Sequence, residues 1–170
     1  MVEDEYKLRC ERVSDINEHL PTLKKYASES EVIVEMGVRS IVSTWALLAS
    51  HPKKMISLDI AHPRDFTGHD AYGCDLDKVE RMAKEEGIDF QFILGSSLTT
   101  QIPECDLLFI DTEHTYNQLT QELKLHSKKV RKYIILHDTN LPLMWKAVED
   151  SGLKVKERFL NNNGLTIIQC

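Results

Sequence analysis

Two aspartates in the second half of the chain each follow a run of apolar residues. Asp111 comes directly after Asp106–Ile110 (DLLFI), and Asp138 comes after Lys132–Leu136 (KYIIL), with only His137 between. Such apolar runs are typical of central strands in a parallel sheet, and strands that follow one another along the chain are often neighbours. The two carboxylates should therefore face each other, where they repel unless they share a proton or a cation. A divalent metal ion held by Asp111 and Asp138 is the natural solution.

Other polar residues also gather where apolar runs end. Glu35 and Gly37 follow the first run, Asp59 closes the second, and Ser96 and Ser97 follow the third. In an open parallel sheet, ligands bind beyond the carboxyl ends of the strands. An acid at the end of the second strand is well placed to bind two vicinal hydroxyls of a ribose. The pattern therefore predicts a ligand site on this rim of the sheet.

Two histidines accompany the aspartates. His114 lies three residues after Asp111, and His137 directly precedes Asp138. Imidazole titrates near neutrality, so either ring is a candidate for acid–base catalysis. A histidine such as His137 also has a structural reading as a hydrogen-bonded core residue. The candidate catalytic residues are Asp111, His114, His137 and Asp138.

The elements that must position these residues alternate between short apolar runs and helical patterns. The expected strands are Glu31–Met36, Met55–Ile60, Asp89–Leu94, Asp106–Ile110 and Lys132–Leu136, with a hairpin of Lys154–Leu160 and Leu165–Gln169 around Asn161–Gly164. The expected helices are Leu20–Ser28, Ile41–Ser50, Asp75–Glu86, Tyr116–Val130 and Leu143–Ser151. Alternating strands and helices predict an α/β fold with a parallel sheet and right-handed crossovers, to which the hairpin adds an antiparallel strand.

Composition excludes several classes of protein. The chain has 170 residues and a net charge of −6, and this acidic balance disfavours binding to nucleic acid. No apolar run reaches the ~20 residues of a membrane span, and Met1–Arg12 has no apolar core of a signal peptide, so no membrane association is expected. The four cysteines form no CxxC pair, which favours reduced thiols in a cytoplasmic protein.

Four stretches together resemble the class I S-adenosylmethionine-dependent methyltransferases. They fit a compact subgroup with E-x-G-V…S-T, F-I-D-x-x-H-x-Y and H-D-T motifs. The stretches are Val34–Thr44 (VEMGVRSIVST), Ile56–Ile60 (ISLDI), Leu108–Tyr116 (LFIDTEHTY) and Tyr133–Thr139 (YIILHDT). The resemblance implies a Rossmann-like, doubly wound, seven-stranded sheet that is mostly parallel with an antiparallel last strand. Residues 1–30 would form an N-terminal helical extension and residues 31–170 the cofactor-binding domain.

The resemblance also implies a role for individual residues. Glu35 and Gly37 would lie against the methionine moiety of S-adenosylmethionine, and Asp59 would hold its ribose. Ser96 and Ser97 would lie near the adenine, and Asp111 would approach the amino group or a metal ion. The expected cofactor-binding residues are Glu35, Gly37, Val38, Arg39, Ser43, Thr44, Asp59, Ile60, Ser96, Ser97 and Asp111.

The expected activity is methyl transfer to a hydroxyl of a small molecule or sugar. Because the sulfonium donor is already activated, the protein must chiefly align the methyl group with the acceptor. A divalent cation such as Mg²⁺ on Asp111 and Asp138 would lower the pKa of the acceptor hydroxyl. His114 or His137 would act as general base, and the Asp111-x-x-His114 spacing favours His114.

Three other functions stay open. Ile41 and Ser96 stand where the family commonly has a glycine and an acid, which favours a cofactor-binding or interaction module that no longer catalyses. A metal-dependent hydrolase is compatible with the same acid/histidine cluster. A nicotinamide-binding domain is disfavoured, because Gly37-x-x-x-Ile41 lacks the G-x-G-x-x-G fingerprint.

The length leaves little chain for recognising an acceptor. Outside the sheet and its helices there remain the first thirty residues and the loop Ala61–Cys74. We expect this loop to be a mobile flap over the cofactor; a metal site of His62, His69 and Asp70 fits no known ligand spacing. An acceptor site this open predicts a homodimer as the way to close it.

Overall fold

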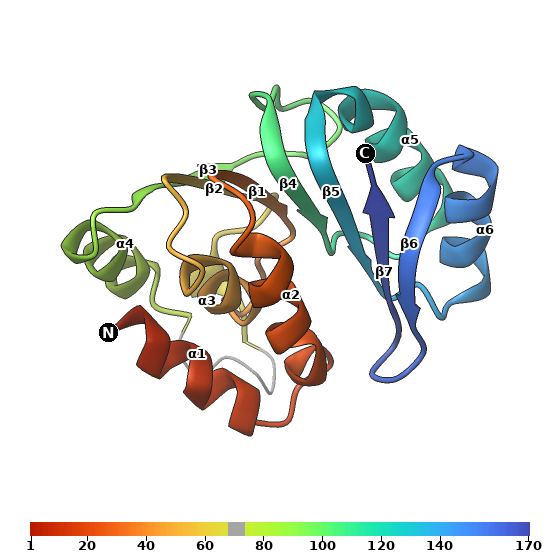
Figure 1. Cartoon of the computed structure of the whole chain (residues 1–170). Helices are drawn as coiled ribbons and strands as arrows, with labels where there is room; N and C mark the ends of the chain where they lie inside the picture. Colours follow the sequence, from red (N-terminus) through yellow and green to blue (C-terminus); the bar gives the residue numbers. More distant parts are fainter. Residues whose placement is uncertain (68–73) are drawn as a thin grey trace.

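Seven strands form a single sheet in a computed structural model that describes residues 1–67 and 74–170 (Figure 1). Their order is β3-β2-β1-β4-β5-β7-β6, with β1 to β5 parallel and β7 antiparallel to both neighbours. The strands are β1 Val32–Met36, β2 Lys54–Asp59, β3 Asp89–Leu94, β4 Cys105–Ile110, β5 Val130–His137, β6 Lys154–Phe159 and β7 Leu165–Gln169. This mixed α/β sheet confirms the predicted fold class.

Helices cover both faces of the sheet (Figure 1). Four of them pack on one face in a single apolar cluster, and two pack on the other face in a second cluster. Successive side chains of β1 point to opposite faces of the sheet, so β1 contributes to both clusters. Ile33 belongs to the first cluster, while Val34 and Met36 belong to the second. The helices of the first face are α1 Val2–Glu11, α2 Leu20–Ala27, α3 Ser43–Leu48 and α4 Leu76–Glu85, and those of the second are α5 Tyr116–His126 and α6 Pro142–Ser151.

The expected boundaries differ from the structure at a few places. The helix predicted over Tyr116–Val130 ends at His126, a 3₁₀ turn follows over Ser127–Lys129, and β5 already begins at Val130. Val130 is buried and pairs with Cys105 of β4, so sheet pairing overrides its place in the helical pattern. Helix α1 has a weak pattern because only Val2 and Arg9 are buried. Its residues nevertheless join the core of the sheet's first face.

The loop after β1 lies directly on the end of β4. Gly37 has φ +87°, and a Cβ atom at this position would lie 1.9 Å from the carbonyl oxygen of Asp111. Only glycine permits this contact. Ile41 adopts φ +58° while its side chain is fully buried, so it takes a left-handed backbone that is unusual for a β-branched residue. Such strain clusters at functional sites.

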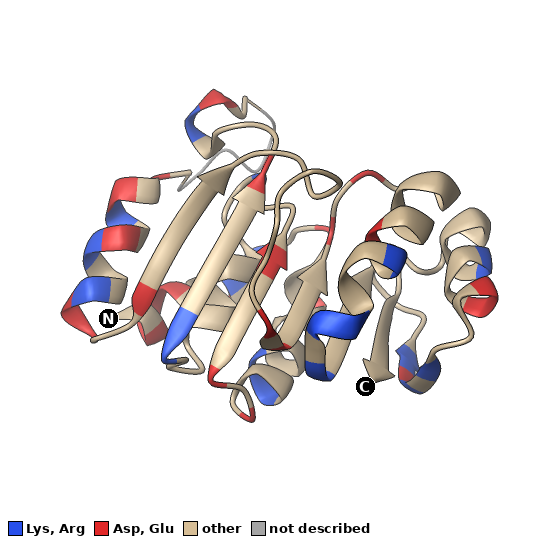
Figure 2. Cartoon of the chain, turned by 90° about the horizontal axis from the view of Figure 1, so that it is seen from above, with Lys and Arg blue, Asp and Glu red and all other residues tan. Residues whose placement is uncertain are grey.

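Charge is distributed over the helices and the strand ends. Figure 2 shows Lys and Arg interspersed with Asp and Glu along the outer helices, whereas the strands carry charged residues mainly at their ends. None of the helices in residues 1–67 and 74–170 is both long and apolar enough to cross a bilayer.

Candidate functional site

A cavity of about 460 Å³ lies at the carboxyl ends of β1 to β4. This volume is in the range of small-molecule sites. Of the eleven residues expected to bind the cofactor, seven line this cavity: Gly37, Arg39, Asp59, Ile60, Ser96, Ser97 and Asp111. Gly95, Leu58, Thr112, Glu113 and Gln118 complete the wall.

A smaller cavity of about 100 Å³ lies beside the first and shares Gly37, Arg39, Asp111 and Thr112 with it. Two further expected cofactor residues, Val38 and Ser43, line this compartment. Its remaining wall consists of Ser40, Val42, His114 and two residues that precede the first strand, Asp15 and Ile16.

Glu35 and Thr44, by contrast, lie beneath the loop after β1 and not on the wall of either cavity. The Glu35 carboxylate is fully buried and accepts hydrogen bonds from the hydroxyls of Ser43 at 2.5 Å, Thr44 at 2.8 Å and Ser57 at 2.6 Å. Burial raises the pKa of Glu35 to about 7, against the opposing effect of the three hydroxyl donors. Glu35 therefore connects β1, β2 and α3 below the site.

Asp59 closes the loop over the larger cavity. Its Oδ2 accepts hydrogen bonds from the backbone N–H groups of Val38 at 2.7 Å and Arg39 at 3.0 Å, and its Oδ1 accepts one from Ala61 at 3.0 Å. A carboxylate offers about four lone-pair positions, and three are occupied by these backbone donors, so about one position on Oδ1 is left for a ligand hydroxyl. Asp59 can thus shape the loop and bind a ligand at once.

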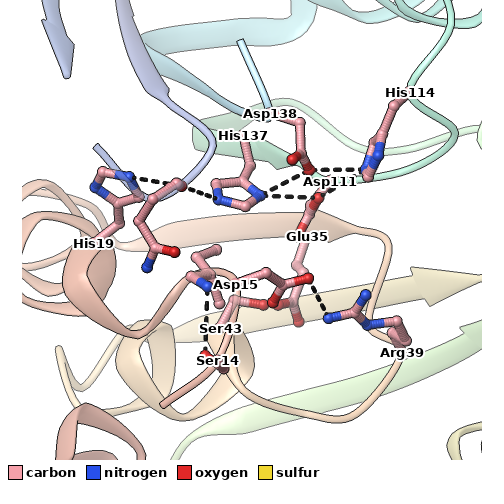
Figure 3. Close-up of polar contacts among 12 residues, drawn as sticks. Ser14, Asp15, His19, Glu35, Arg39, Ser43, Asp111, His114, His137 and Asp138 are labelled. Atoms are coloured by element: carbon pink, nitrogen blue, oxygen red, sulfur yellow. Dashed lines mark hydrogen bonds and ion pairs between the residues drawn. The ribbon is translucent and has the colours of Figure 1, made fainter. Parts of the chain in front are cut away.

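The acid/histidine cluster predicted from the sequence is assembled at the ends of β4 and β5 (Figure 3). Asp138 Oδ2 lies 2.9 Å from His114 Nε2 and 2.9 Å from His137 Nδ1. Asp111 Oδ1 lies 3.4 Å and 3.3 Å from the same two nitrogens. His137 and Asp138 are buried, and Asp138 adopts φ +56°. The structure therefore brings all four candidate catalytic residues together.

Opposite charges stabilise one another within this cluster. Hydrogen bonds that His114 donates to Asp111 and Asp138 raise its pKa to about 10. Burial alone would lower the pKa of His137, but the same two carboxylates raise it to about 10. Burial alone would raise the pKa values of both aspartates, yet the two imidazoles lower them. At neutral pH the cluster thus holds two carboxylates and two imidazolium ions.

Residues from the chain's two ends contact the far side of His137. The His137 Nε2 atom lies 3.3 Å from the carbonyl oxygen of Asn162, in the loop between β6 and β7. His19, also buried, has its Nε2 2.9 Å from the Asn161 carbonyl oxygen and 3.2 Å from that of Asn162. Because carbonyls only accept, both Nε2 atoms must carry hydrogen. No sequence motif predicts a role for His19, so this contact is evident only in the structure.

A buried carboxylate supports the opposite end of the larger cavity. Glu122 Oε1 accepts hydrogen bonds from Ser97 Oγ at 2.6 Å, Thr112 Oγ1 at 2.8 Å and Gln118 Nε2 at 2.9 Å. The pattern of the helix predicted over Tyr116–Val130 places Leu119 on the apolar face and the glutamates on the opposite, exposed face. Glu122 is nevertheless fully buried, and burial raises its pKa. It orients Ser97 and Gln118, which line the cavity.

The donor atoms of Asp111, His114 and Asp138 fit a divalent cation. One ligand atom from each lies within 4.8 Å of the others. Two carboxylates and one imidazole suit ions such as Mn²⁺, Fe²⁺ or Zn²⁺ better than the all-oxygen preference of Mg²⁺. The alternative of His62, His69 and Asp70 depends on two positions outside the described residues, and so does the middle of the expected flap, residues 68–73.

Comparisons with known proteins identify the fold. No family model and no curated protein matches the sequence. The structure is similar to an O-methyltransferase family protein from Burkholderia thailandensis, with a TM-score of 0.62 and 11% identity over 91% of this chain and 55% of that one. It is also similar to a putative caffeoyl-CoA O-methyltransferase from Staphylococcus aureus, with a TM-score of 0.61 and 12% identity over 89% of this chain and 82% of the other.

A third similar structure is the SAH-bound methyltransferase PaMTH1 of Podospora anserina, with a TM-score of 0.57 and 13% identity over 98% of this chain and 86% of the other. The chain therefore shares the seven-stranded α/β fold of these methyltransferases. It spans only about 55% of the length of the Burkholderia protein. At identities of 11% to 13%, the likeness establishes the fold alone.

Proposed function

We propose that this chain is an S-adenosylmethionine-dependent methyltransferase that methylates a hydroxyl group of a small molecule or sugar. The observation that carries the proposal is the cluster of Asp111, His114, His137 and Asp138 beside a two-compartment cavity at the ligand position of this fold. An acid/histidine cluster can accept a proton from a hydroxyl, and methyl transfer to oxygen requires that proton to leave.

The larger cavity suits the adenosine part of the donor. Asp59 Oδ1 has an acceptor position for a ribose hydroxyl, and the Ile60 side chain, 77% exposed, provides an apolar surface at the cavity wall. Ser96 and the Gln118 carboxamide provide polar groups further along the wall. A mostly apolar wall with a few convergent polar groups is what a nucleoside ligand needs.

Transfer breaks the bond between sulfur and the methyl carbon and forms one between that carbon and the acceptor oxygen. The acceptor's proton passes to the acid/histidine cluster. Both imidazoles are protonated at neutral pH and the pKa values of both carboxylates are lowered, so the cluster without a further cation is a weak base. His114 would become a base if another cation engaged its two carboxylate partners without coordinating His114 itself.

A divalent cation would be held by Asp111, His114 and Asp138. When bound, it would act as a Lewis acid that lowers the pKa of the acceptor hydroxyl. As a ligand of the cation, His114 would be neutral with its Nε2 lone pair occupied, so in that arrangement it would hold the cation and not act as the base.

The test measures binding first and turnover second. Calorimetric titration with S-adenosylmethionine should show binding to the wild type and weaker but measurable binding to the double variant Asp111→Asn/Asp138→Asn, because Asp111 also lines the cavity. Formation of S-adenosylhomocysteine with catechol or glucose as acceptor should fall by about 100-fold or more in the double variant. The matched control Asp77→Asn/Asp150→Asn changes two aspartates on the helices. Assays with EDTA or with added Mn²⁺ report on the cation.

Absence of binding to the wild type would overturn the proposal. Binding with no turnover would favour the second candidate function, a cofactor-binding module that no longer catalyses. One observation favours that candidate: the four polar side chains of the cluster are paired with one another. Such pairing would also serve a purely structural purpose.

A further inference from the structure

A further cavity lies between the two helices of the sheet's second face, α5 and α6, and is called here the α5–α6 cleft. Its volume of about 430 Å³ is in the range of small-molecule sites. The two helices lie side by side (Figure 1), and none of the residues that line the cleft lines either of the two cavities described above. A ligand in this cleft would therefore occupy a site of its own, independent of the proposed function.

Part of the wall of the α5–α6 cleft is apolar. Leu123 of α5 and Ala147 of α6 are almost completely buried and belong to the apolar cluster of the sheet's second face. Leu153 and the Tyr116 ring are partly buried and pack against the same cluster. The apolar body of a ligand would be stabilised by covering this surface, because both surfaces would then be removed from water.

The cleft also carries two lysines that have no partner in the described part of the chain. Lys124 lies in the last turn of α5 and Lys128 in the 3₁₀ turn that follows. Both are exposed, and neither forms a hydrogen bond or ion pair with a described residue. Asp150, the acid among the lining residues, is already paired with Lys146 Nζ at 3.0 Å and with the Tyr116 hydroxyl at 2.8 Å. The unbalanced charge of the cleft is therefore positive, although the whole chain has a net charge of −6.

Two hydroxyl groups beside these lysines are also unpaired. The Ser127 hydroxyl, next to Lys128, makes no hydrogen bond to the residues that the structure describes. The Thr120 Oγ1 atom is buried and likewise has no partner among them. A buried hydroxyl without a partner costs free energy, which a bound polar group or water can recover. The cleft thus combines two ammonium groups, two hydroxyl groups and an apolar wall.

Lysines at the end of a helix also have a structural explanation. The carbonyl groups at the C-terminus of α5 carry a partial negative charge, which nearby cations stabilise. This effect accounts for positive charge at the end of the helix, but not for two lysines and an unpaired buried hydroxyl around one cavity. The two explanations make different predictions, because only a binding site would distinguish one small anion from another.

We propose that the α5–α6 cleft binds a phosphate monoester of a small, largely apolar alcohol. A phosphate monoester carries about 1.5 to 2 negative charges at pH 7, which the ammonium groups of Lys124 and Lys128 would balance through charge-assisted hydrogen bonds. The Ser127 hydroxyl would donate to a further phosphate oxygen. The apolar part of the ligand would lie against Leu123 and Leu153.

Three probes separate the contribution of the phosphate from that of the apolar body. 2-Naphthyl phosphate has both parts, 2-naphthol has only the apolar body, and inorganic phosphate has only the charged group. Calorimetry on the full chain should show binding of 2-naphthyl phosphate that is at least about tenfold tighter than binding of either other probe. In amide NMR spectra, 2-naphthyl phosphate should shift the signals of Ser127, Lys128 and Leu153, and not those of Gly37 and Ser96, which line the larger cavity.

Paired lysine variants test the two ammonium groups. Lys124→Gln/Lys128→Gln should weaken the binding of 2-naphthyl phosphate by about 10- to 100-fold and leave the binding of 2-naphthol unchanged. The control Lys7→Gln/Lys84→Gln removes the same charge from exposed positions of α1 and α4 and should keep the wild-type affinity. Both double variants should unfold within about 2 °C of the wild type, which shows that they are folded.

Four results would show that the assignment is wrong. These are no binding of 2-naphthyl phosphate, equally tight binding of inorganic phosphate, wild-type affinity in Lys124→Gln/Lys128→Gln, and an equal loss of affinity in the control. Amide shifts at Gly37 and Ser96 in place of Ser127 and Leu153 would also overturn it, because the probe would then occupy the larger cavity. None of these measurements involves S-adenosylmethionine, so the proposed function is tested separately.

Discussion

The Glu35 carboxylate stabilises the loop after β1 and does not line either cavity. The family resemblance assigns it to the methionine moiety, and the structure places its carboxylate under the loop with three hydroxyl donors. Any effect of Glu35 on ligand binding would then act through Ser43, which lines the smaller cavity. The residue is best probed through stability.

Replacing Glu35 by Gln should change how stability depends on pH. Burial raises the folded-state pKa from 4.5 to about 7, so the folded protein keeps a proton that the unfolded chain releases between these values. This contribution is fully present below pH 4.5 and is lost as the pH rises through 7. The unfolding free energy of Glu35→Gln minus that of the wild type should therefore increase by up to about 3 kcal/mol as the pH rises from 4.5 to 8.

Urea denaturation of both proteins across this pH range measures the difference. The other titratable groups are common to the two proteins and cancel in the comparison. A constant difference between the two stability curves would contradict the assigned pKa.

Gly37 allows the loop after β1 to touch the end of β4, and this predicts a large penalty for alanine. Gly37→Ala would combine a left-handed backbone with a Cβ atom 1.9 Å from the Asp111 carbonyl oxygen. We expect a loss of about 2–4 kcal/mol in unfolding free energy. Gly87→Ala is the matched control, because Gly87 has φ +75° and nothing within 4 Å of the added atom. It should lose only about 1 kcal/mol.

Denaturation of the two alanine variants separates the clash from the backbone preference. Equal losses would show that β4 yields to the added methyl group. Gly37 was expected at the ligand from its position in the motif. The need for glycine where the loop after β1 approaches the end of β4 follows only from the distance between the two backbones. That distance cannot be read from a sequence.

At the scale of elements, the strands follow closely from the sequence. β3 and β7 begin and end where the alternation of apolar residues predicts, and the ends of β4 and β5 bring Asp111 and Asp138 together. Central strands are buried on both faces and therefore consist of continuous apolar runs, which are easily recognised in a sequence. Contacts between elements that are far apart in the sequence leave no such pattern, so the roles of His19 and Glu122 were not predicted.

The contact between the turn before α2 and the β6–β7 hairpin should contribute measurably to stability. His19→Phe keeps a ring of similar size but removes the N–H group that faces Asn161 and Asn162. The unfolding free energy should fall by about 1–2 kcal/mol, because two part-buried hydrogen bonds to these carbonyls are lost. Hydrogen exchange of the Gly164 amide, which donates to Asn161, should accelerate.

His51→Phe serves as the control, since the His51 side chain is 58% exposed and should change stability by less than about 0.5 kcal/mol. If His19→Phe leaves both the stability and the exchange rate unchanged, the hairpin is held by its own turn and not by His19.

At the scale of the whole molecule, the N-terminal helices are part of the same core as the sheet. Val2, Leu20 and Leu23 are fully buried in the apolar cluster of the first face. The first thirty residues therefore do more than extend the domain, and through Asp15 they reach the smaller cavity. The homodimer expected from the short chain stays a prediction, because the acceptor side of the site is not defined by these contacts.

The contact between His19 and the hairpin loop also has a consequence for how the protein is made. Its two sides are separated by 142 residues of sequence. During synthesis the segment around His19 therefore leaves the ribosome well before its partner. Contacts of such separation form late in folding. The far side of His137 can therefore be completed only after Asn162 has been synthesised, when strands β1 to β6 and the four residues of the acid/histidine cluster have already been made.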